Sequence, residues 1–487
     1  MPGDWSSHWP RRNCMRSWLW QHRSILYSLG TAVFAFLIYL PTLAPDLTWQ
    51  ANSGDGGELI TAAVTLGIPH PPGYPTYILL GKLFSLLPFE PVAYRFHLLS
   101  ALCAAMAAGL VTSTAQKLKV VSDAQAALSL STIPGLIFAF SPLVWDQAVV
   151  AEVYSLNLLA VAAFLWALLG KWPPFIIGFC LGLSLTTHLT SLFLWPLTLA
   201  LTPAKKWGTL TIGALTGASP FLLLPALARQ GSPVLWGNPN TLAGWWWLVS
   251  GQIYQANQFA LPFAKLWPRL LIWVGTFAQQ LAIFGWPLLL LAGQKVQNGR
   301  SLTRRIWWRL LGTAVFYLIY ALLYNTEDAI VLTLPALLMF SLCLTPAVYS
   351  LKRWGVFLPG TALLLHLLSQ NGANIHNIRQ QAEQILEPAP PGAILITSGD
   401  PDIFSLWYFH HVEGQRPDII LVDDKLFAFD WYRHNLGQQH STLRALDEDN
   451  LTLFEAANKP QHAICQVHFA SGPSGKVAID CLQDSIE

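Results

Sequence analysis

The chain has 487 residues, of which 53% are hydrophobic and 11% are charged, whereas soluble proteins carry roughly 25% charged residues. So few charged side chains cannot cover a water-soluble globule of this size, and 22 Trp and 25 Phe suit a bilayer and its interfaces. The net charge of +2 gives no sign of a nucleic-acid partner. The composition therefore excludes a soluble enzyme, a disordered chain and a DNA-binding protein, and it indicates a polytopic α-helical membrane protein.

Eleven apolar segments are predicted to cross the ~30 Å of hydrocarbon in a bilayer. The first is expected to stay as an anchor, because no small-residue cleavage site follows it. The stretch 174–201 can be two short helices that meet at His188 or one long kinked helix. The eleven segments are residues 24–43, 96–115, 124–144, 153–169, 174–187, 189–201, 210–228, 270–292, 307–323, 330–348 and 355–368.

The basic residues predict the orientation of these spans. Outside the tail, sixteen Lys and Arg lie at the N-terminus and in alternate loops, against five in the other loops. The positive-inside rule then places the N-terminus in the cytoplasm and the C-terminus outside, with a bacterial inner membrane as the expected location. Acidic residues contribute little to topology, so their gathering on the outer side indicates a site. The outer acids before residue 371 are Asp46, Asp55, Glu58, Glu90, Asp146, Glu152, Glu327 and Asp328.

The composition changes at about Asn371. The last 117 residues hold 16 acidic and 7 basic residues, and they alternate short apolar runs with Pro/Gly punctuation. We therefore predict a membrane domain over residues 1–370 and a small extracytoplasmic α/β domain over residues 371–487. Its expected elements are strands at residues 393–397 and 418–422, a helix at 404–411 and a helical stretch after Asp430.

The first outer loop, residues 45–95, is the most informative stretch. Glycines flank Asp55, and they permit tight backbone turns and close approach of a substrate. A helix that begins there would place Asp55 and Glu58 on one face, because the two are three residues apart. The other interpretation is helix capping, with Ser53 or Asp55 as the N-cap and Glu58 near the third helical position. The two interpretations are compatible.

Other outer residues carry weaker signals. His70 stands among Pro69, Pro71, Pro72 and Pro75, and it is either a functional side chain or a packing residue. Glu152 lies at the lip of an apolar helix, where an ionisable group is costly unless it has a partner or a function. The tryptophan run 245–247 is expected to belong to an interfacial aromatic belt rather than to stack on sugars.

The first-loop pattern SGDGGEL…GIPHPPGYPTY resembles that of GT-C superfamily membrane glycosyltransferases that use polyprenyl-phosphate sugars. More narrowly, it is similar to bacterial relatives of a vertebrate endoplasmic-reticulum protein O-mannosyltransferase. The resemblance continues over nearly the whole chain. It runs through Trp145, residues 152–156, His188, residues 236–239 and 251–254, and in the tail through residues 394–400, 406–408, 416–418 and 431–432.

This resemblance implies an inverting transfer of a sugar, with mannose suggested, from a polyprenyl-phosphate donor to a hydroxyl of a protein or glycan acceptor at the outer face. Asp55 would be the general base, or a ligand of a metal or of the acceptor, and Glu58 would support it. Arg95 would hold the donor phosphate, since a planar guanidinium suits phosphate, although it can equally snorkel to lipid headgroups. The residues expected to bind substrate are His70, Tyr74, Arg95, Glu152, Tyr154, His188, Trp236, Asn238 and Tyr254.

Two questions stay open from the sequence. A divalent metal is compatible with the resemblance, but no spacing of His and acidic residues defines a metal site. The alternative to an enzyme is a transporter or binding protein for lipid-linked glycans, which would need a path that also opens inward.

Cys465 and Cys481 are the cysteines of the predicted extracytoplasmic domain, where oxidation is permitted. They lie on two apolar-rich stretches, residues 463–470 and 476–482, which read as a hairpin joined by residues 471–475. With Pro473 at the midpoint of the turn, the two cysteines face each other, and opposed residues are close enough for a disulfide. The alternative is a pair of reduced cysteines that pack as small apolar side chains.

Overall fold

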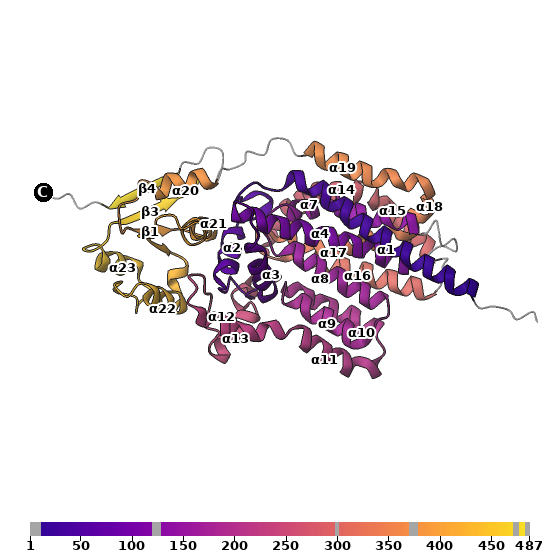
Figure 1. Cartoon of the computed structure of the whole chain (residues 1–487), viewed down its shortest axis with the longest axis horizontal. Helices are drawn as coiled ribbons and strands as arrows, with labels where there is room; N and C mark the ends of the chain where they lie inside the picture. The colour runs from indigo at the N-terminus through magenta and orange to yellow at the C-terminus, as the bar shows by residue number, and fades with distance from the viewer. Residues whose placement is uncertain (1–10, 119–127, 298–300, 370–377, 471–476, 483–487) are drawn as a thin grey trace, which may run out of the picture.

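The structure is a computed structural model that describes residues 11–118, 128–297, 301–369, 378–470 and 477–482. Figure 1 shows a bundle of helices with a small sheet and its helices at one end of the long axis. We call residues 378–482 the C-terminal α/β unit. The predicted domain boundary near Asn371 lies outside the described residues. Helix α1 begins at the end of the bundle that lies away from the C-terminal α/β unit (Figure 1).

The apolar segments form the bundle. Its helices are α1 (Arg11–Tyr39), α4 (Val92–Lys117), α6 (Thr132–Ala139), α7 (Pro142–Ala148), α8 (Tyr154–Leu169), α9 (Pro174–Leu185), α10 (Trp195–Leu201), α11 (Trp207–Gly217), α12 (Leu224–Leu227), α13 (Leu242–Val249), α14 (Phe263–Gln279), α15 (Gly285–Gln297), α16 (Ser301–Leu323), α17 (Leu334–Cys343), α18 (Thr345–Leu351) and α19 (Phe357–Ser369). Short 3₁₀ turns, such as η3 (Leu189–Leu194) and η9 (Ala329–Thr333), extend or join them.

Within the described residues, four helical stretches are long and apolar enough to cross a membrane: His22–Thr42, Val92–Lys117, Ala204–Gln230 and Thr303–Leu323. Counting each of three bent helix pairs as one span raises this number to seven, and three shorter apolar helices are also present. All eleven predicted segments coincide with these helices, apart from residues 124–127, which lie outside the described residues. The protein is therefore rich in membrane helices, while the count of eleven spans stays a prediction.

The stretch 174–201 is divided rather than continuous. Helix α9 ends at Leu185, His188 is extended with a φ of −169°, and η3 then leads into α10. The structure thus has the two short helices that meet at His188. Helix α9 packs closely on α11, because Gly178 and Gly182 lie against backbone carbonyls of α11. This close packing of small residues spaced four apart is typical of membrane helices.

The first outer loop folds into two short helices between the bundle and the C-terminal α/β unit. Helix α2 (Gly56–Thr65) is buried along most of its length, and α3 (Pro75–Ser85) packs between α2 and α4. Figure 1 places α2 beside α21 (Asp400–Trp407) of the C-terminal α/β unit. A Cβ atom at Gly57 would lie 2.2 Å from the carbonyl oxygen of Phe404. The glycine therefore permits direct backbone contact between α2 and α21.

The C-terminal α/β unit contains a four-stranded sheet in the order β2-β1-β3-β4. Strands β1 (Ile394–Thr397) and β3 (Ile464–His468) pair in parallel, β1 also pairs in parallel with β2 (Ile420–Asp423), and β4 (Ala478–Leu482) pairs antiparallel with β3. Strands β1 and β2 are buried along their whole length, as expected for apolar parallel strands with both faces covered. The accompanying helices are α20 (Ile378–Leu386), α21, the π-helical turn η11 (Tyr408–Val412), α22 (Asp430–Gln439) and α23 (Leu451–Asn458).

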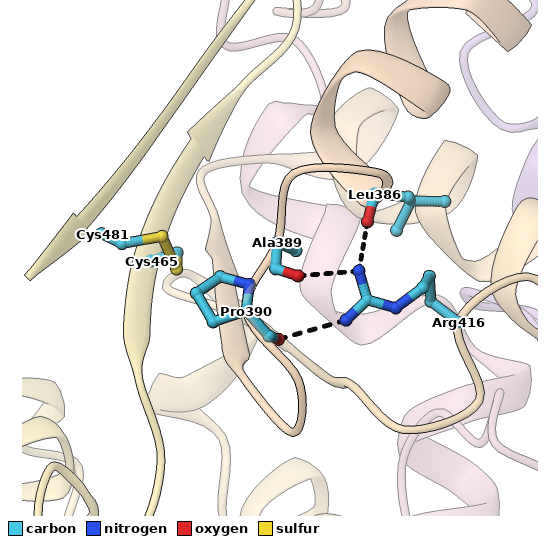
Figure 2. The surroundings of a disulfide bond; sticks show 6 residues. All are labelled: Leu386, Ala389, Pro390, Arg416, Cys465 and Cys481. Carbon is cyan, nitrogen blue, oxygen red and sulfur yellow. Dashed lines mark hydrogen bonds between the residues drawn. A yellow bond between two sulfur atoms is a disulfide. The ribbon is translucent and has the colours of Figure 1, made fainter.

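The predicted hairpin is present in this sheet. Cys465 on β3 lies opposite Cys481 on β4, and a disulfide with an S–S distance of 2.04 Å joins them. The predicted turn, residues 471–475, lies outside the described residues. Figure 2 shows the disulfide beside the loop after α20, where Arg416 donates hydrogen bonds to the carbonyl oxygens of Ala389 at 2.8 Å and Pro390 at 3.1 Å. Arg416 thereby holds the segment that leads into β1.

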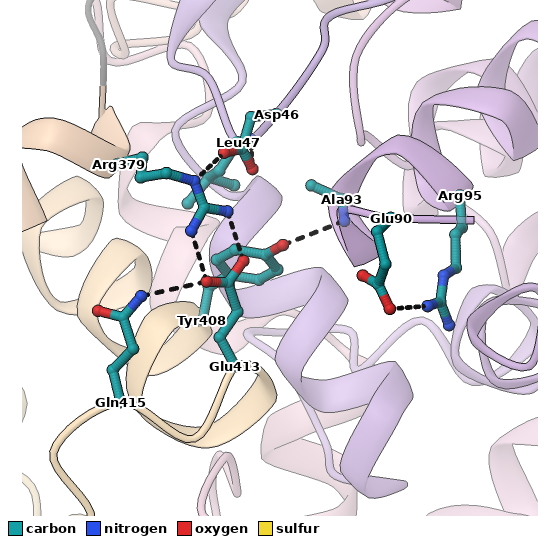
Figure 3. A network of polar contacts seen from close by, with 9 residues as sticks. All are labelled: Asp46, Leu47, Glu90, Ala93, Arg95, Arg379, Tyr408, Glu413 and Gln415. Atoms are coloured by element: carbon teal, nitrogen blue, oxygen red, sulfur yellow. Dashed lines mark hydrogen bonds and ion pairs between the residues drawn. The ribbon is translucent and has the colours of Figure 1, made fainter. Parts of the chain in front are cut away.

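Polar contacts tie the C-terminal α/β unit to the bundle (Figure 3). Arg379 on α20 forms a bidentate pair with Glu413, at 2.5 and 2.6 Å, and also contacts Asp46 of the first outer loop at 2.5 Å. The backbone N–H of Ala93, at the start of α4, donates to the hydroxyl of Tyr408 at 3.2 Å. Apolar side chains of α2, α3 and α4 also share one buried core with those of the sheet and α21. One buried core therefore has members on both sides of Asn371, and the division into two domains stays a prediction.

Candidate active site

Three side chains of the first outer loop form an ionic chain. Glu58 accepts a hydrogen bond from the backbone N–H of His70 at 3.1 Å and contacts the imidazole Nδ1 at 2.5 Å. The other ring nitrogen, Nε2, lies 3.7 Å from a carboxylate oxygen of Asp55. The Glu58 side chain is fully buried, that of His70 is 10% exposed, and that of Asp55 is 37% exposed. Asp55 is thus the member of the chain that a substrate can reach.

The position of these acids bears on the capping interpretation. Asp55 occupies the N-cap of α2, but its side chain makes no capping hydrogen bond, and the Ser53 hydroxyl contacts the carbonyl oxygen of Ala151 at 3.4 Å. Glu58 lies in the first turn of α2 and is engaged by His70. Both carboxylates therefore face His70, and Asp55 does not cap the helix backbone.

The electrostatics of the three groups follow from burial and mutual charge. Burial raises the pKa of Glu58 to about 7, against the opposing effect of His70. Burial alone would lower the pKa of His70, but the charges of Glu58 and Asp55 outweigh it and raise that pKa to about 10. Burial also raises the pKa of Asp55, and the positive His70 limits this rise. The two acids thus favour the protonated imidazole of His70, and its positive charge in turn lowers the pKa of each acid relative to burial alone.

Three further acids from distant parts of the chain surround Asp55. Glu152 is 1% exposed, and one of its carboxylate oxygens is buried without a hydrogen-bond partner among the described residues. Burial and the charge of Asp55 raise the pKa of Glu152 well above its usual value. Asp328, next to η9, and Asp400, at the start of α21, lie near enough for their charges to raise the pKa of Asp55 and of Glu58 respectively. For Asp400 itself, burial and Asp55 raise the pKa to about 6.

Aromatic rings pack edge-to-face around His70. The ring centroid of Tyr74 is 5.1 Å from that of His70, and the centroids of Trp236 and Tyr254 are both 6.2 Å from it. The structure therefore brings His70, Tyr74, Trp236 and Tyr254 together, and Asp55, Glu58 and Glu152 lie close enough for their charges to act on His70. The expected roles of these residues in catalysis and substrate binding stay predictions.

The remaining predicted residues lie further out. His188 contacts the ring of Tyr154 at 5.6 Å between centroids, and its Nδ1 accepts a hydrogen bond from the backbone of Thr190 at 3.2 Å. Asn238 lines a separate cavity of about 790 Å³ between the loop that precedes α13 and helix α22. Tyr154 and His188 nevertheless lie close to the acidic cluster, because the charges of Glu152 and Asp55 act on the Tyr154 hydroxyl and that of His70 acts on His188.

Arg95, the predicted ligand of the donor phosphate, is engaged by groups of the protein itself. Its guanidinium donates to the carbonyl oxygens of Ser85 and Phe89 and pairs with Glu90 at 2.8 Å (Figure 3). These contacts hold the turn between α3 and α4. Its phosphate-binding role stays a prediction, and a donor would compete there with the Glu90 side chain, which is 77% exposed.

Metal binding was left open by the sequence. Among residues 11–118, 128–297, 301–369, 378–470 and 477–482, no group of three or more His, Cys, Asp or Glu side chains is arranged to hold a metal ion.

Sequence analysis did not select Asp328, Asp400 or Trp431 as site residues. Asp328 was recognised only as one of the outer acids, and Asp400 and Trp431 only as parts of tail motifs. The Trp431 ring lies 5.3 Å from that of Trp236, which in turn contacts His70. Nothing in their local sequence marks these residues, because they reach the site only through the docking of the C-terminal α/β unit and of η9.

The fold and the site together define a class: an integral membrane protein with an acidic site where its apolar helices meet an α/β unit. Two family models match the chain. The model of the N-terminal domain of protein O-mannosyl-transferase TMEM260 matches residues 55–211, which begin at Asp55, and the model of TMEM260-associated domain 2 matches residues 378–452. The predicted resemblance to protein O-mannosyltransferases is thus confirmed in both parts of the chain.

Curated relatives agree with these matches. The protein O-mannosyl-transferase TMEM260 of Mus musculus is 30% identical over 460 residues, which cover 83% of this chain and 63% of the mouse protein. The protein of the same name from Dictyostelium discoideum is 24% identical over 495 residues, which cover 82% of this chain and 57% of that relative. The chain therefore spans about three fifths of the length of these relatives.

Solved structures with a similar arrangement include ArnT from Cupriavidus metallidurans. Its apo form aligns with a TM-score of 0.48 at 14% identity, over 85% of this chain and 91% of ArnT. The form bound to undecaprenyl phosphate aligns with a TM-score of 0.49 at 12% identity, over 94% of this chain and 97% of ArnT.

Proposed function

We propose that this protein is an inverting GT-C-type glycosyltransferase that moves a sugar, mannose by the names of its relatives, from a polyprenyl-phosphate donor to an acceptor hydroxyl at the extracytoplasmic face. The observation that carries the proposal is the ionic chain of Asp55, His70 and Glu58, in which only Asp55 is substantially exposed. The matching family model begins at Asp55, and two relatives that align with more than four fifths of the chain are named protein O-mannosyl-transferases.

In this proposal Asp55 is the general base. Its carboxylate takes the proton of the acceptor hydroxyl while the hydroxyl oxygen attacks the anomeric carbon of the sugar. The bond from that carbon to the phosphate oxygen breaks, the electron pair leaves with the lipid phosphate, and the configuration at the anomeric carbon inverts. Burial raises the pKa of Asp55, and a raised pKa makes its carboxylate a stronger base than that of an ordinary aspartate.

His70 and Glu58 act on Asp55 rather than on the substrate. Two contacts from Glu58 hold the imidazole in place, and the imidazolium keeps Asp55 ionised beside the other acids. Arg95 is retained as the proposed ligand of the donor phosphate, because a guanidinium can exchange an exposed carboxylate for a phosphate.

The test is transfer of radiolabelled mannose from polyprenyl-phosphate mannose by the purified protein, with a panel of other polyprenyl-phosphate sugars in parallel. Asp55→Asn keeps the size of the side chain but removes the base, so turnover should fall roughly 10²–10⁴-fold. Glu58→Gln should cost less, because it still accepts a hydrogen bond from His70. Unchanged melting curves in detergent would show that both variants fold.

Two outcomes would contradict the proposal. Wild-type turnover by Asp55→Asn would remove Asp55 from the chemistry. Movement of a labelled lipid-linked sugar across proteoliposomes, without transfer from any donor in the panel, would favour the transporter alternative.

A further inference from the structure

We infer that the cavity between the loop at residues 228–252 and helix α22 is a second ligand site, separate from the acidic cluster, and that it binds a neutral saccharide. The cavity has a volume of about 790 Å³, which lies in the range of sites that enclose small ligands. Trp236 is buried and packs ring to ring against both Trp431, which lines the cavity, and His70. A ligand in the cavity is thereby separated from Asp55, so this inference does not rest on the proposed transfer of a sugar.

Three aromatic side chains line the cavity. The rings of Phe429 and Trp431 are stacked, with an interplanar angle of 27°, and Trp247 is inclined to them by 62° and 51° respectively. The cavity therefore offers ring surfaces in two orientations. The face of an aromatic ring carries partial negative charge, which attracts polarised C–H groups, and the C–H groups of many pyranoses gather on one face of the sugar ring. Walls of this kind suit a saccharide.

Both walls of the cavity are anchored to other parts of the protein. The side chain of Asn435, on α22, donates to the carbonyl oxygen of Leu235 at 2.9 Å, which joins α22 to the opposite loop. On α13, the indole N–H of Trp245 donates to the carbonyl oxygen of Phe221 at 2.9 Å. Because the walls are already held in place, binding has a smaller cost in conformational entropy.

Part of the polar lining is free to bind a ligand. Asn238 and Gln252 line the cavity, and among the described residues no hydrogen bond engages their side-chain amides. Each amide has donors and an acceptor, which match the hydroxyl groups of a saccharide because a hydroxyl both donates and accepts. The amide of Gln438, in contrast, is already hydrogen-bonded to His434 at 2.9 Å.

The charges at the cavity are paired within the protein. Asp430 is the one Asp, Glu, Lys or Arg among the described lining residues, and it pairs with Arg433. Arg229 donates to the amide of Asn240, another lining residue, at 3.3 Å. A phosphate or sulfate group would therefore lack a free cation here, whereas a neutral ligand with many hydroxyl groups needs none.

A polypeptide is less suited to these walls. An extended peptide commonly pairs its backbone with the exposed edge of a strand. The described lining residues belong to α13, α22, short 3₁₀ turns and the loops between them, and none belongs to a strand of the sheet. The cavity thus offers ring surfaces and side-chain amides rather than a backbone edge.

The experiment is isothermal titration of the full-length protein in nanodiscs of unglycosylated phospholipid, because detergents with sugar headgroups would compete for the cavity. The probes are mannotetraose, maltotetraose, sulfated maltotetraose and an uncharged ten-residue Ser/Thr/Gly peptide. We expect at least one neutral tetrasaccharide to bind, and the sulfated sugar and the peptide to bind at least five-fold more weakly. Binding of neither neutral tetrasaccharide, or equal or tighter binding of the peptide or the sulfated sugar, would overturn the inference.

Variants locate the bound saccharide. Trp247→Ala and Gln252→Ala should each weaken its binding at least five-fold. Trp246→Ala and Gln255→Ala are the matched controls, because they belong to the same tryptophan run and the same short turn but do not line the cavity. Asp55→Asn should bind the saccharide as the wild type does.

Equal affinities in Trp247→Ala and Trp246→Ala, or a loss of binding only in Asp55→Asn, would place the saccharide elsewhere and refute this site. Sugar transfer by the wild type is measured separately. Saccharide binding with the expected pattern, but no transfer from any donor, would keep this site and refute the glycosyltransferase. Transfer without saccharide binding would do the reverse.

Discussion

The local sequence of His70 leaves its role open. A histidine among prolines is as compatible with packing as with function, yet here the imidazole lies between two carboxylates and is ringed by Tyr74, Trp236 and Tyr254. Its positive charge lowers the pKa of Asp55 relative to burial alone. We therefore regard His70 as a positioning residue that keeps the base ionised.

This role predicts a pH effect. A general base works only when it is deprotonated, so the acid limb of the kcat/KM profile reports its pKa. His70→Gln removes the positive charge, so the pKa of Asp55 rises and the acid limb moves to higher pH. Activity at acidic pH should fall more than activity at alkaline pH. The measurement is kcat/KM for sugar transfer from pH 5 to pH 9.

His462→Gln is the control, because that ring contacts the carbonyl oxygen of Gly392 within the C-terminal α/β unit. Its profile should match that of the wild type. A uniform loss of activity at every pH in His70→Gln would instead indicate a purely structural histidine.

Helix α2 needs a glycine at position 57 so that it can pack against α21, as well as glycines for the turn that precedes it. The backbone carbonyl of Phe404 on α21 occupies the space where a side chain at Gly57 would begin. The indole N–H of Trp49 adds a hydrogen bond to the hydroxyl of Ser405 at 3.0 Å. Helix α2 therefore carries the acids and also forms the docking surface for α21.

Gly57→Ala should consequently destabilise this contact by about 1–3 kcal/mol, because a methyl group is forced against backbone atoms that cannot move aside. Thermal unfolding of the detergent-solubilised protein measures the loss. Gly54→Ala is the matched control, since its nearest neighbour, the Pro401 side chain, would lie at an ordinary 3.5 Å. Equal melting temperatures for the two variants would show that α2 and α21 separate easily.

The edge hairpin gives a second prediction at this scale. The Cys465–Cys481 disulfide closes a loop with a sequence separation of 16 residues. Closing a loop of about that size removes chain entropy from the unfolded state and should stabilise the fold by roughly 3 kcal/mol. Cys465→Ser should therefore raise hydrogen exchange in β3 and β4 without affecting α1 or α4. Thiol labelling of the non-reduced wild-type protein should leave both cysteines unmodified, and ready labelling of both would contradict the pairing.

At the scale of the whole molecule, docking of the C-terminal α/β unit completes the site. Asp400 and Trp431 come from this unit, Asp328 comes from beside η9, and Asp55 comes from the first outer loop. Arg379 spans the junction through Asp46 and Glu413. Its side chain is 31% exposed, so solvent weakens these ion pairs without removing them.

Arg379→Ala should lower the free energy needed to undock the C-terminal α/β unit by about 1 kcal/mol. The undocked population should then be several-fold larger. Hydrogen exchange in α20 and α21 should increase, and sugar transfer should fall in parallel. Arg444→Ala, an exposed arginine in the same unit, is the control and should change neither. Faster exchange with full activity would show that the docked unit is dispensable for the chemistry.

Composition and local pattern were enough to predict the features that depend on residues close together in the chain. The apolar segments predicted the membrane helices, because burial in lipid requires continuous hydrophobic runs. The short apolar strands and the symmetric hairpin predicted the sheet and the register of Cys465 and Cys481, because pairing across a short turn is local. The glycines beside Asp55 drew attention to the first outer loop because they are its sequence neighbours, while the catalytic role of Asp55 stays a prediction.

The groups that join these acids from distant parts of the chain could not be predicted, because they depend on how separate elements pack. Asp328 and Asp400 lie about 270 and 345 residues after Asp55 in the sequence, and their approach depends on how η9 and α21 pack. The partner of His70, the contacts of Arg95 and the cavity beside Trp431 likewise follow from packing between separate elements. Local patterns cannot specify such contacts, because the same side chain is a cap, a surface residue or a site residue according to what folds against it.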